Sequence, residues 1–428
     1  MKIVEMQVTP IALGDPPLLN AAGLHAPYAL RTVVELVTDN GLRGVAEVPG
    51  SSAFARAIEQ AREVVIGADP LNWHALKGKV AAHCGTKSAR IDDATPWNHG
   101  AYVQVLSALN VACLDLMGRA FNVTVAALLG GVLRERVPYS AYLFYKHEGA
   151  GGELGFGTDP RATGWAAARQ AAALDPDGIV NQARAVVREF GFKSIKLKGG
   201  VFEPAQEIAA MKALREAFGP GVPLRIDPNA RWSVETSIKA GRELEGVLEY
   251  LEDPTSGQEG MAAVRRALTT PLATNMCTTS FEDLPGSVRL GSEDIILTDH
   301  HFWGGLNAAM ELAAHCRTFG RGVSMHSNNH GGISLAAMTH LGAAMPNLSF
   351  ALDTHYPWQW EDVIVGGRLR IEDGCVALPK GPGLGVELDR AALARAHENF
   401  RRCGLKDRDD AFEMRKKIPG WKFQSMCW

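Results

Sequence analysis

From Val137 onward the chain alternates short apolar runs with amphipathic helical patterns, and this alternation constrains the fold most strongly. Helical patterns lie between the runs, for example at 203–218, 233–245, 304–319 and 332–344. Eight strand–helix units over about 240 residues predict an α/β fold, a (β/α)8 barrel. A doubly wound open sheet is the alternative, but polar residues follow nearly every run, which favours the barrel. The predicted strands are 137–143, 193–198, 223–227, 248–252, 271–274, 294–298, 322–326 and 349–353.

The region before the barrel has a different pattern. Residues 31–37 and 42–48 read as two strands joined by the turn Thr38-Asp39-Asn40-Gly41, whereas residues 54–130 read as helices. The clearest helix is 102–121, which we interpret as a core helix. The expected organisation is an α+β domain at 1–133, the barrel at 134–378 and a C-terminal segment, 379–428, that packs back on the first domain. The glycine-rich stretch 147–170 is expected to be a loop.

Composition excludes several functional classes. The chain has 428 residues, 46% hydrophobic and 21% charged, and its net charge of −3 gives no reason to expect a nucleic-acid partner. We expect no membrane partner, because no apolar run approaches the roughly 18–20 residues that span a bilayer. The N-terminus lacks the apolar core of a signal peptide. Seven scattered cysteines without a Cys-x-x-Cys spacing indicate reduced thiols, and a cytoplasmic location is expected.

Two lysines end the second predicted barrel strand. Lys196 and Lys198 are two residues apart, so they point to the same face. Neighbouring ammonium groups and burial both disfavour the charged form, so a lysine here is expected to have a lowered pKa and to serve as a base. The alternative is an exposed strand end with two solvated lysines.

Oxygen-bearing side chains follow the next three strands. Asp227, Glu252 and Asn275 are each separated by one strand–helix unit and should converge as hard ligands, which suits Mg²⁺. For each residue alone, capping of the following helix is the alternative. Glu259 is the alternative ligand if the loop after Glu252 folds differently.

The sixth and seventh strands end in Asp299 and His326. On adjacent strands the carboxylate would bond one imidazole nitrogen, fix the tautomer and raise the basicity of the other nitrogen. This would place a second base across the barrel mouth from Lys198. The alternative, a core histidine bonded to backbone, applies to His300 and His301, which receive no role.

Taken together, these residues resemble the enolase superfamily, and within it the D-glucarate dehydratase family. The resemblance covers essentially the whole chain and is specific, because several of its strings are not generic barrel features. The strings are GLHAP (Gly23–Pro27), FKSIKLKGG (Phe192–Gly200), DPN (Asp227–Asn229), LATNM (Leu272–Met276), DHHFW (Asp299–Trp303), HSNNH (His326–His330), DTH (Asp353–His355) with Trp358, RDDA (Arg408–Ala411) and PGW (Pro419–Trp421).

The resemblance implies a barrel with an N-terminal capping domain that the C-terminal tail completes. It implies a Mg²⁺-dependent hydro-lyase that converts an aldarate, D-glucarate and also L-idarate, to 5-keto-4-deoxyglucarate. A homo-oligomer is expected. Carried over by position, the catalytic residues are Lys198, its cationic neighbour Lys196, His326, Asp299 and Asn229, and Mg²⁺ is bound by Asp227, Glu252 and Asn275. The implied substrate-binding residues are Asn20, His25, Tyr142, Asn328, His355 and Arg408.

The sequence departs from the family in the expected substrate cap. Region 95–103 lacks a threonine expected near its end, and 147–170 is not familial. Three alternatives follow: a dehydratase or epimerase of another acid sugar such as galactarate, a low-activity relative of the family, and a non-catalytic paralogue. The last is disfavoured because both bases and all three ligands are present.

Overall fold

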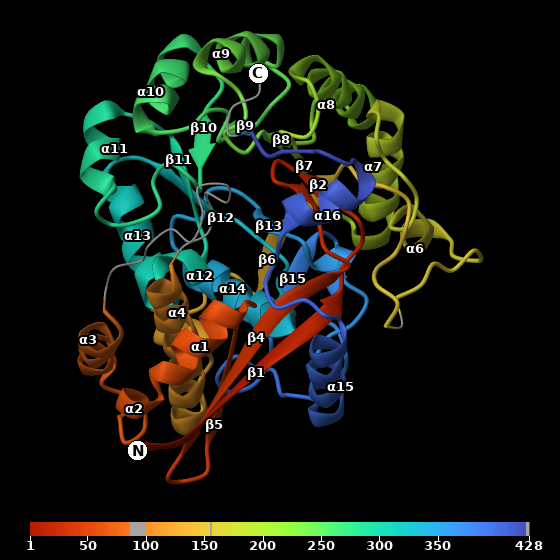
Figure 1. The fold of residues 1–428 in the computed structure, drawn as a ribbon. Coiled ribbons are helices and arrows are strands. Elements are labelled where there is room, and N and C mark those ends of the chain that lie inside the picture. Colours follow the sequence, from red (N-terminus) through yellow and green to blue (C-terminus); the bar gives the residue numbers. More distant parts are fainter. Residues whose placement is uncertain (86–99, 155, 425–427) are drawn as a thin grey trace.

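Eight short strands form the centre of the molecule, and each overlaps one of the predicted runs (Figure 1). The computed structural model describes residues 1–85, 100–154, 156–424 and 428. Apart from Arg136, Pro138 and Gly322, all residues of these strands are buried, which explains why they read as apolar runs. The strands are β6 (Arg136–Phe144), β7 (Ile195–Lys198), β8 (Leu224–Asp227), β9 (Tyr250–Glu252), β10 (Leu272–Thr274), β11 (Ile295–Thr298), β12 (Gly322–Met325) and β13 (Leu352–Thr354).

The strands follow one another around a ring. Consecutive strands from β6 to β12 pair in parallel, and β13 pairs in parallel with β6. A parallel bridge joins Val323 of β12 to Leu348, and the Ser349 N–H donates to the Val323 carbonyl at 3.0 Å. The last strand therefore lies beside the first, which an open sheet would not give.

Helices connect the strands and surround the ring (Figure 1). Their ends carry ordinary stop and start signals. The Asp175 carboxylate caps α7 at 2.7 Å from the Gly178 N–H, Pro176 occupies its first turn, and Gly191 ends it in the left-handed region. The helices are α7 (Pro176–Phe190), α8 (Pro204–Phe218), α9 (Val234–Glu243), α10 (Gln258–Ala267), α11 (Leu284–Leu290), α12 (His300–Trp303), α13 (Leu306–Thr318) and α14 (Gly332–Ala344).

The N-terminal region is a three-stranded antiparallel sheet covered by helices. The predicted hairpin is confirmed, because β4 pairs with β5 across the turn at 39–42, and β1 pairs with the other edge of β4. The sheet strands are β1 (Ile3–Gly14), β4 (Tyr28–Thr38) and β5 (Arg43–Pro49), and a small ladder joins β2 (Leu19–Asn20) to β3 (Gly23–Leu24). The helices are α1 (Ser52–Gln60), α2 (Arg62–Val65), α3 (Trp73–Cys84), α4 (Ala101–Phe121) and α5 (Val125–Leu128).

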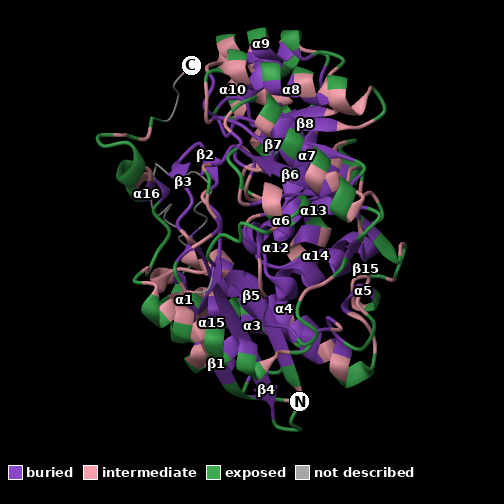
Figure 2. Ribbon diagram, turned by 90° about the vertical axis from the view of Figure 1, so that its right-hand side faces the viewer, coloured by how far each residue is buried: buried purple, intermediate pink, exposed green. Residues whose placement is uncertain are grey.

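Helix α4 corrects one expectation. By length and composition it could cross a membrane, with a mean hydropathy of 1.4, although the sequence suggested that no apolar run comes close. However, 78% of that stretch is buried inside the protein, where α4 packs on β5 and α1 (Figure 2). The interpretation of 102–121 as a core helix is confirmed.

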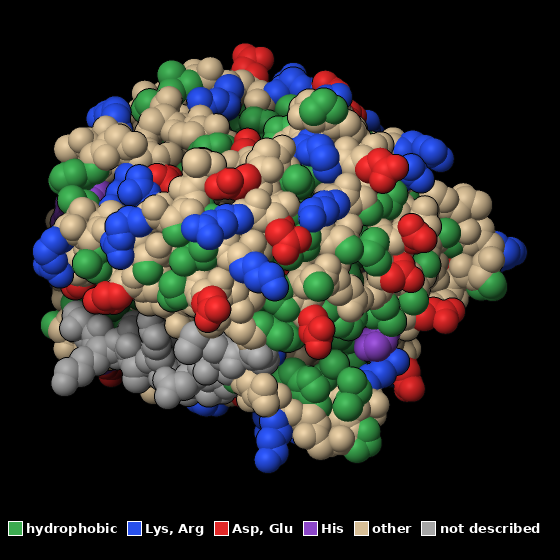
Figure 3. All heavy atoms as spheres, turned by 90° about the horizontal axis from the view of Figure 1, so that it is seen from above, with side chains coloured by type: hydrophobic (Ala, Val, Ile, Leu, Met, Phe, Trp, Pro, Cys, Tyr) green, Lys and Arg blue, Asp and Glu red, His purple; other side chains and the backbone are tan. Residues whose placement is uncertain are grey.

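Two helices of the C-terminal segment pack on the N-terminal region. Helix α15 (Arg390–Arg402) packs on β1, where the His397 ring bonds the Pro10 carbonyl at 2.7 Å, and α16 (Asp410–Lys417) packs on β3. A hairpin of β14 (Ile371–Glu372) and β15 (Cys375–Ala377) extends the sheet beside β6. The boundaries at 133 and 378 stay predictions. On the face shown in Figure 3, the basic side chains are interspersed with acidic ones.

The stretch 147–170 is largely irregular and contains one short helix, α6 (Gly164–Ala168). Buried Lys146 stands at its entrance. The Lys146 ammonium donates to the carbonyls of His147 at 2.6 Å and Ala171 at 2.7 Å, so it ties the two ends of the loop together. The expectation of a loop is therefore confirmed for the described part of this stretch.

Candidate active site

A cavity of about 460 Å³ lies where the N-terminal strands, the loops after β11 and β12, and the C-terminal segment meet. Three residues that the resemblance assigned to substrate line it: His25, Asn328 and Arg408. Phe302 also lines it and stacks on the His326 ring, with 5.6 Å between ring centroids. Phe302 thus connects the cavity lining to the predicted second base, although His326 itself does not line the cavity. Residues 95–99, part of the region that departs from the family, lie outside the described residues.

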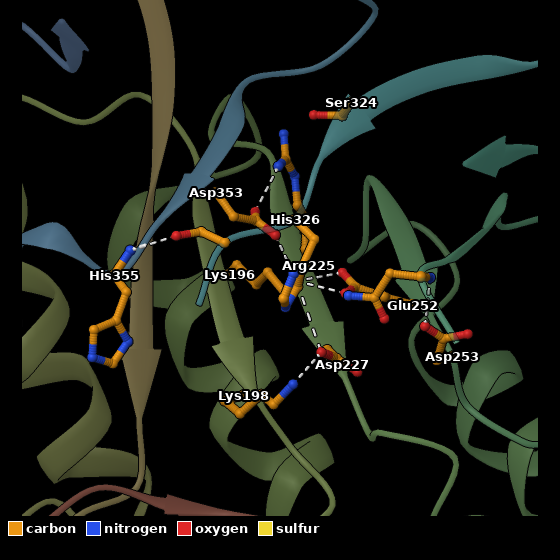
Figure 4. A network of polar contacts seen from close by, with 12 residues as sticks. Lys196, Lys198, Arg225, Asp227, Glu252, Asp253, Ser324, His326, Asp353 and His355 are labelled. Atoms are coloured by element: carbon orange, nitrogen blue, oxygen red, sulfur yellow. Dashed lines mark hydrogen bonds and ion pairs between the residues drawn. The ribbon is translucent and has the colours of Figure 1, made fainter. Parts of the chain in front are cut away.

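Lys196 occupies the centre of a buried cluster of carboxylates (Figure 4). The Lys196 Nζ lies 2.7 Å from Glu252 Oε1, 2.7 Å from Asp353 Oδ2 and 3.8 Å from Asp227 Oδ2, and 4.8 Å above the Tyr142 ring. Burial alone lowers the pKa of Lys196, but the charges of Asp353 and Glu252 outweigh it and hold the pKa well above its ordinary value. The expectation of a lowered pKa is therefore wrong for Lys196, which remains cationic. The alternative of two solvated lysines is also wrong, because both are buried.

Lys198 faces the same cluster from the end of β7. The Lys198 Nζ lies 2.6 Å from Asp227 Oδ2, so the two lysines share a face as predicted. Asn229 follows with a left-handed backbone (φ 54°), which lets its N–H bond Asp227 Oδ1 at 2.9 Å and its side-chain amide reach the same oxygen at 3.2 Å. The amide thereby orients the Asp227 carboxylate.

The three predicted metal ligands follow adjacent strands. Asp227 and Glu252 meet around Lys196 from β8 and β9, and Asn275 follows β10 with its backbone N–H on Asp253 Oδ2 at 2.8 Å. Glu259, the alternative ligand, is exposed in the first turn of α10. The structure brings Glu252, and not Glu259, to the cluster.

These residues fit a divalent cation. Burial, and then the charge of Asp227, raise the pKa of Glu252 well above its ordinary value. The same causes raise the pKa of Asp253 to about 7. The buried cluster therefore disfavours negative charge on Glu252 and Asp253 unless a cation compensates it. Glu252 Oε2 is buried with no hydrogen-bond partner among the described residues, although Lys196 Nζ is 2.5 Å away. An all-oxygen donor set of this charge suits Mg²⁺.

Asp299 and His326 form the predicted pair across the barrel mouth. His326 Nδ1 lies 3.2 Å from Asp299 Oδ2, which leaves Nε2 as the basic nitrogen. Burial lowers the pKa of His326, and the Asp299 carboxylate only partly restores it. The carboxylate was expected to raise the basicity of the imidazole, but burial decides the direction.

The Asp299 carboxylate lies close to two further histidine rings. It caps α12 by accepting from the His301 N–H at 2.9 Å, and it lies 3.0 Å from His301 Nδ1 and 3.6 Å from His330 Nε2. The His301 Nε2 lies 2.9 Å from the Glu47 carbonyl, so the interpretation of His301 as a backbone-bonded core histidine is confirmed. His300 is equally buried, but neither of its ring nitrogens has a hydrogen-bond partner among the described residues.

Asn328 connects the Asp299–His326 pair to the N-terminal sheet through hydrogen bonds. Its amide nitrogen lies 3.4 Å from Asp299 Oδ2, and its amide oxygen accepts from buried Arg31 at 2.9 Å. Arg31 is in turn paired with Glu47 at 2.6 Å. The strands of the N-terminal sheet thereby fix a residue of the predicted substrate site.

His25 and His355 meet at Asp15, a residue to which the sequence assigned no role. His25 Nδ1 lies 2.8 Å from Asp15 Oδ2, His355 Nε2 lies 3.2 Å from Asp15 Oδ1, and the two rings stack with 5.8 Å between centroids. In the same region, the guanidinium of Arg408 pairs with both oxygens of Asp410, 2.7 Å from Oδ1 and 2.5 Å from Oδ2. These contacts gather the predicted substrate residues from both ends of the chain.

The two remaining predicted substrate-binding residues, Asn20 and Tyr142, lie in different parts of the site. The Asn20 amide donates to Asp410 Oδ2 at 2.7 Å, so Asn20 belongs to the Arg408 group. Tyr142 is buried beneath Lys196, and its carbonyl accepts from the Trp358 indole at 2.8 Å. Neither residue lies among those that line the cavity.

Sequence reasoning missed three residues. Asp353 contacts Lys196 and lies 3.4 Å from Arg225, and its place as the last residue of the eighth predicted strand was an available signal. Asp15 and Arg31 lie in the N-terminal sheet region, far from their partners in sequence, and no local pattern marks them.

Known proteins resemble this chain over nearly its full length. Residues 178–392 match the family described as Enolase C-terminal domain-like. A probable glucarate dehydratase of Streptomyces coelicolor is 46% identical over 430 residues, covering 98% of this chain and 97% of the relative. A crystal structure of an enolase from Thermobispora bispora complexed with magnesium and formate is 51% identical, with a TM-score of 0.91 and 98% of both chains covered. Another, from Pseudomonas fluorescens with bound magnesium, potassium and tartrate, is 46% identical, with a TM-score of 0.91 and coverage of 99% and 98%.

Proposed function

Because this chain belongs to the enolase superfamily, we propose that it is a Mg²⁺-dependent hydro-lyase that converts an aldarate, D-glucarate and also L-idarate, to 5-keto-4-deoxyglucarate. The ring of strands and the N-terminal sheet are consistent with the barrel and capping domain of that superfamily. A cytoplasmic location, a homo-oligomeric state and the absence of a nucleic-acid or membrane partner stay predictions.

The observation that supports the proposal is that two groups able to transfer protons follow strands of the same ring. Lys198 and the carboxylate cluster lie at the ends of β7 to β9, and the His326–Asp299 pair lies at the ends of β11 and β12. Two proton-transfer groups that face each other across a substrate can remove a proton and protonate a leaving group.

The reaction removes the proton from C5 of the diacid, beside its C6 carboxylate. We assign that proton to Lys198 in one epimer, with lysine in its neutral form, and to His326 Nε2 in the other. The C4 hydroxyl then leaves as water after it takes a proton from the His326 imidazolium, and the resulting enol becomes the C5 ketone. The charge of Lys196 stabilises the carboxylate-derived anion as it forms.

Asp227, Glu252 and Asn275 would hold the Mg²⁺. Bound there, the ion would stabilise negative charge on the C6 carboxylate as the proton leaves. Asn229 orients Asp227 for this role. Arg408, Asn20, His25 and His355 are assigned to the far end of the substrate, Asn328 to the end near His326, and Tyr142 supports Lys196.

The proposal predicts a strict requirement for a divalent metal. The purified protein should dehydrate D-glucarate or L-idarate in a panel of aldaric and aldonic acids that includes galactarate. EDTA should abolish product formation, and excess Mg²⁺ should restore it, because the ligand set is all oxygen. Activity that survives complete chelation would contradict the metal assignment, and no turnover of any aldarate would contradict the function.

Asn275 should tune the site for a dianionic substrate. With Asp227 and Glu252 ionised, the charge of Mg²⁺ and its ligands is 2 − 1 − 1 = 0, whereas an aspartate at 275 makes it −1 and repels an incoming carboxylate. Asn275→Asp should therefore raise KM about tenfold at saturating Mg²⁺. The measurement is steady-state kinetics with metal occupancy determined separately. Asn275→Gln keeps an amide oxygen without charge and is the control, and equal KM values for both variants would contradict the charge argument.

A further inference from the structure

The carboxylate of Asp15 has three polar partners although it is buried, with 2% of its surface exposed. It lies directly after β1, next to the cavity. The Asn329 amide donates to its Oδ2 at 2.6 Å, and His25 Nδ1 and His355 Nε2 lie at 2.8 and 3.2 Å. Neither the proposed proton transfers nor the metal ligands use this group.

Asp15 is an acceptor in all three contacts. Burial raises the pKa of Asp15, but the charge and hydrogen bonds of His25 and the hydrogen bond of His355 outweigh burial and hold it below the ordinary value. An ionised carboxylate has no proton to donate, so the imidazole nitrogens that face it must carry theirs. Burial also lowers the pKa of His355, which favours its neutral form. A neutral imidazole has one N–H, so neutral His355 keeps Nδ1 as an acceptor, and a neutral His25 would keep Nε2 as one.

We propose that Asp15 is a positioning and specificity-determining residue, which holds His25 and His355 as hydrogen-bond acceptors for the hydroxyl groups of a polyhydroxylated diacid. The inference rests on the proposed function and deepens it, because it concerns how the far end of the substrate is selected.

The surroundings of the two rings complement this role. His25 lines the cavity, and the His355 ring stacks against it nearly in parallel, at 16°. The charged groups that face the pair, besides Asp15, are Arg408 and Asp410. Arg408 lines the same cavity, and its Nη1 lies 3.4 Å from Asn329 Oδ1. A carbon that bears a hydroxyl beside a carboxylate matches this set, because the hydroxyl donates to an imidazole while the carboxylate accepts from Arg408.

The test compares two diacids that differ only in hydroxyl groups. Succinate and L-tartrate have the same length and charge, and their affinities for the Mg²⁺-loaded protein are measured by isothermal titration calorimetry. In Asp15→Asn the amide oxygen can accept from one imidazole, but its NH₂ must donate to the other, which turns one acceptor into a donor. The preference for tartrate should fall at least fivefold, while succinate binds as well as before or more tightly, because one negative charge is removed. General structural damage would instead weaken both ligands in parallel.

Asp410→Asn is the matched control. This substitution also removes one negative charge beside the cavity. The side chain of Asp410 bonds Asn20 and Arg408, and not the imidazole nitrogens that face Asp15. The substitution should change the affinities for succinate and tartrate by the same factor. An equal loss of tartrate preference in both variants would overturn the proposal.

Nitrogen-15 NMR of histidine-labelled protein gives a readout that does not depend on ligand or activity. In the wild-type protein, His25 Nδ1 and His355 Nε2 should be the protonated nitrogens, and in Asp15→Asn one ring should change its tautomer. If the variant does not fold, the wild-type spectrum is a sufficient test by itself. A proton on His25 Nε2 or on His355 Nδ1 in that spectrum would overturn the proposal. If neither diacid binds the wild-type protein, the proposed function fails, whereas the spectra still decide the role of Asp15.

Discussion

His326→Asn is expected to lower kcat for dehydration by about 10²–10⁴-fold with both epimeric substrates. The imidazole is the only group assigned to protonate the departing hydroxyl, and asparagine can keep the contact with Asp299 but cannot carry the proton. Exchange of the α-proton with solvent deuterium should survive in the epimer that Lys198 serves. Product formation and proton NMR in deuterium oxide measure the two steps separately.

Two further variants make this result specific. His330 also lies near Asp299, at 3.6 Å, but it is fully buried, so His330→Asn is the matched control and should keep kcat within about tenfold. Lys198→Ala should abolish exchange in the epimer that Lys198 serves and keep it in the epimer that His326 serves. If one of the two base variants lost exchange with both epimers while the other kept both, the assignment of two bases would be wrong.

Lys196→Met is expected to lower the free energy of unfolding by about 3–5 kcal/mol in the absence of added metal. The substitution leaves Glu252 and Asp353 buried without the ammonium that now lies 2.7 Å from each. Methionine fills a similar volume, so the loss reports charge rather than a cavity. Urea denaturation followed by circular dichroism in EDTA gives the difference.

Lys193→Met is the control for this variant. Lys193 also pairs with a carboxylate, Asp373 at 2.6 Å, but both side chains are more than 70% exposed, so the loss of stability should be far smaller than that of Lys196→Met. Added Mg²⁺ should raise the stability of Lys196→Met more than that of the wild type, because a cation that binds only the folded state compensates the missing charge. Equal losses for both variants would contradict the buried-cluster explanation.

The sequence was sufficient to predict the strands and helices that have a local hydrophobic pattern. The runs that became β6 to β13 are buried on both faces, so their apolar character was visible without partners. Once the strand order was predicted, neighbouring strands brought Asp299 to His326, and the structure confirms that contact. The periodic helix at 102–121 was equally readable, although its fitness for a membrane by composition was overlooked.

Local patterns could not predict contacts between residues that are distant in the sequence. The predicted pKa direction of Lys196 was wrong because only burial and its neighbour Lys198 were considered, whereas carboxylates from three other strands surround it. The basicity of His326 was judged from Asp299 without the burial that outweighs it. Asp15 escaped notice because its partner His355 is 340 residues away, and only the fold makes them neighbours.

The assembly of the cavity from Asp15 near one end and Arg408 near the other has a consequence for the protein during its synthesis. A ribosome that has released the whole strand ring has still not released α16, so the growing chain has the residues proposed as bases and metal ligands but lacks part of the cavity wall. Under the proposed function, we therefore expect catalytic competence only after α15 docks on β1 and α16 docks on β3. Nascent chains and chains cut before α16 should therefore be inactive, so that only the intact chain turns over substrate.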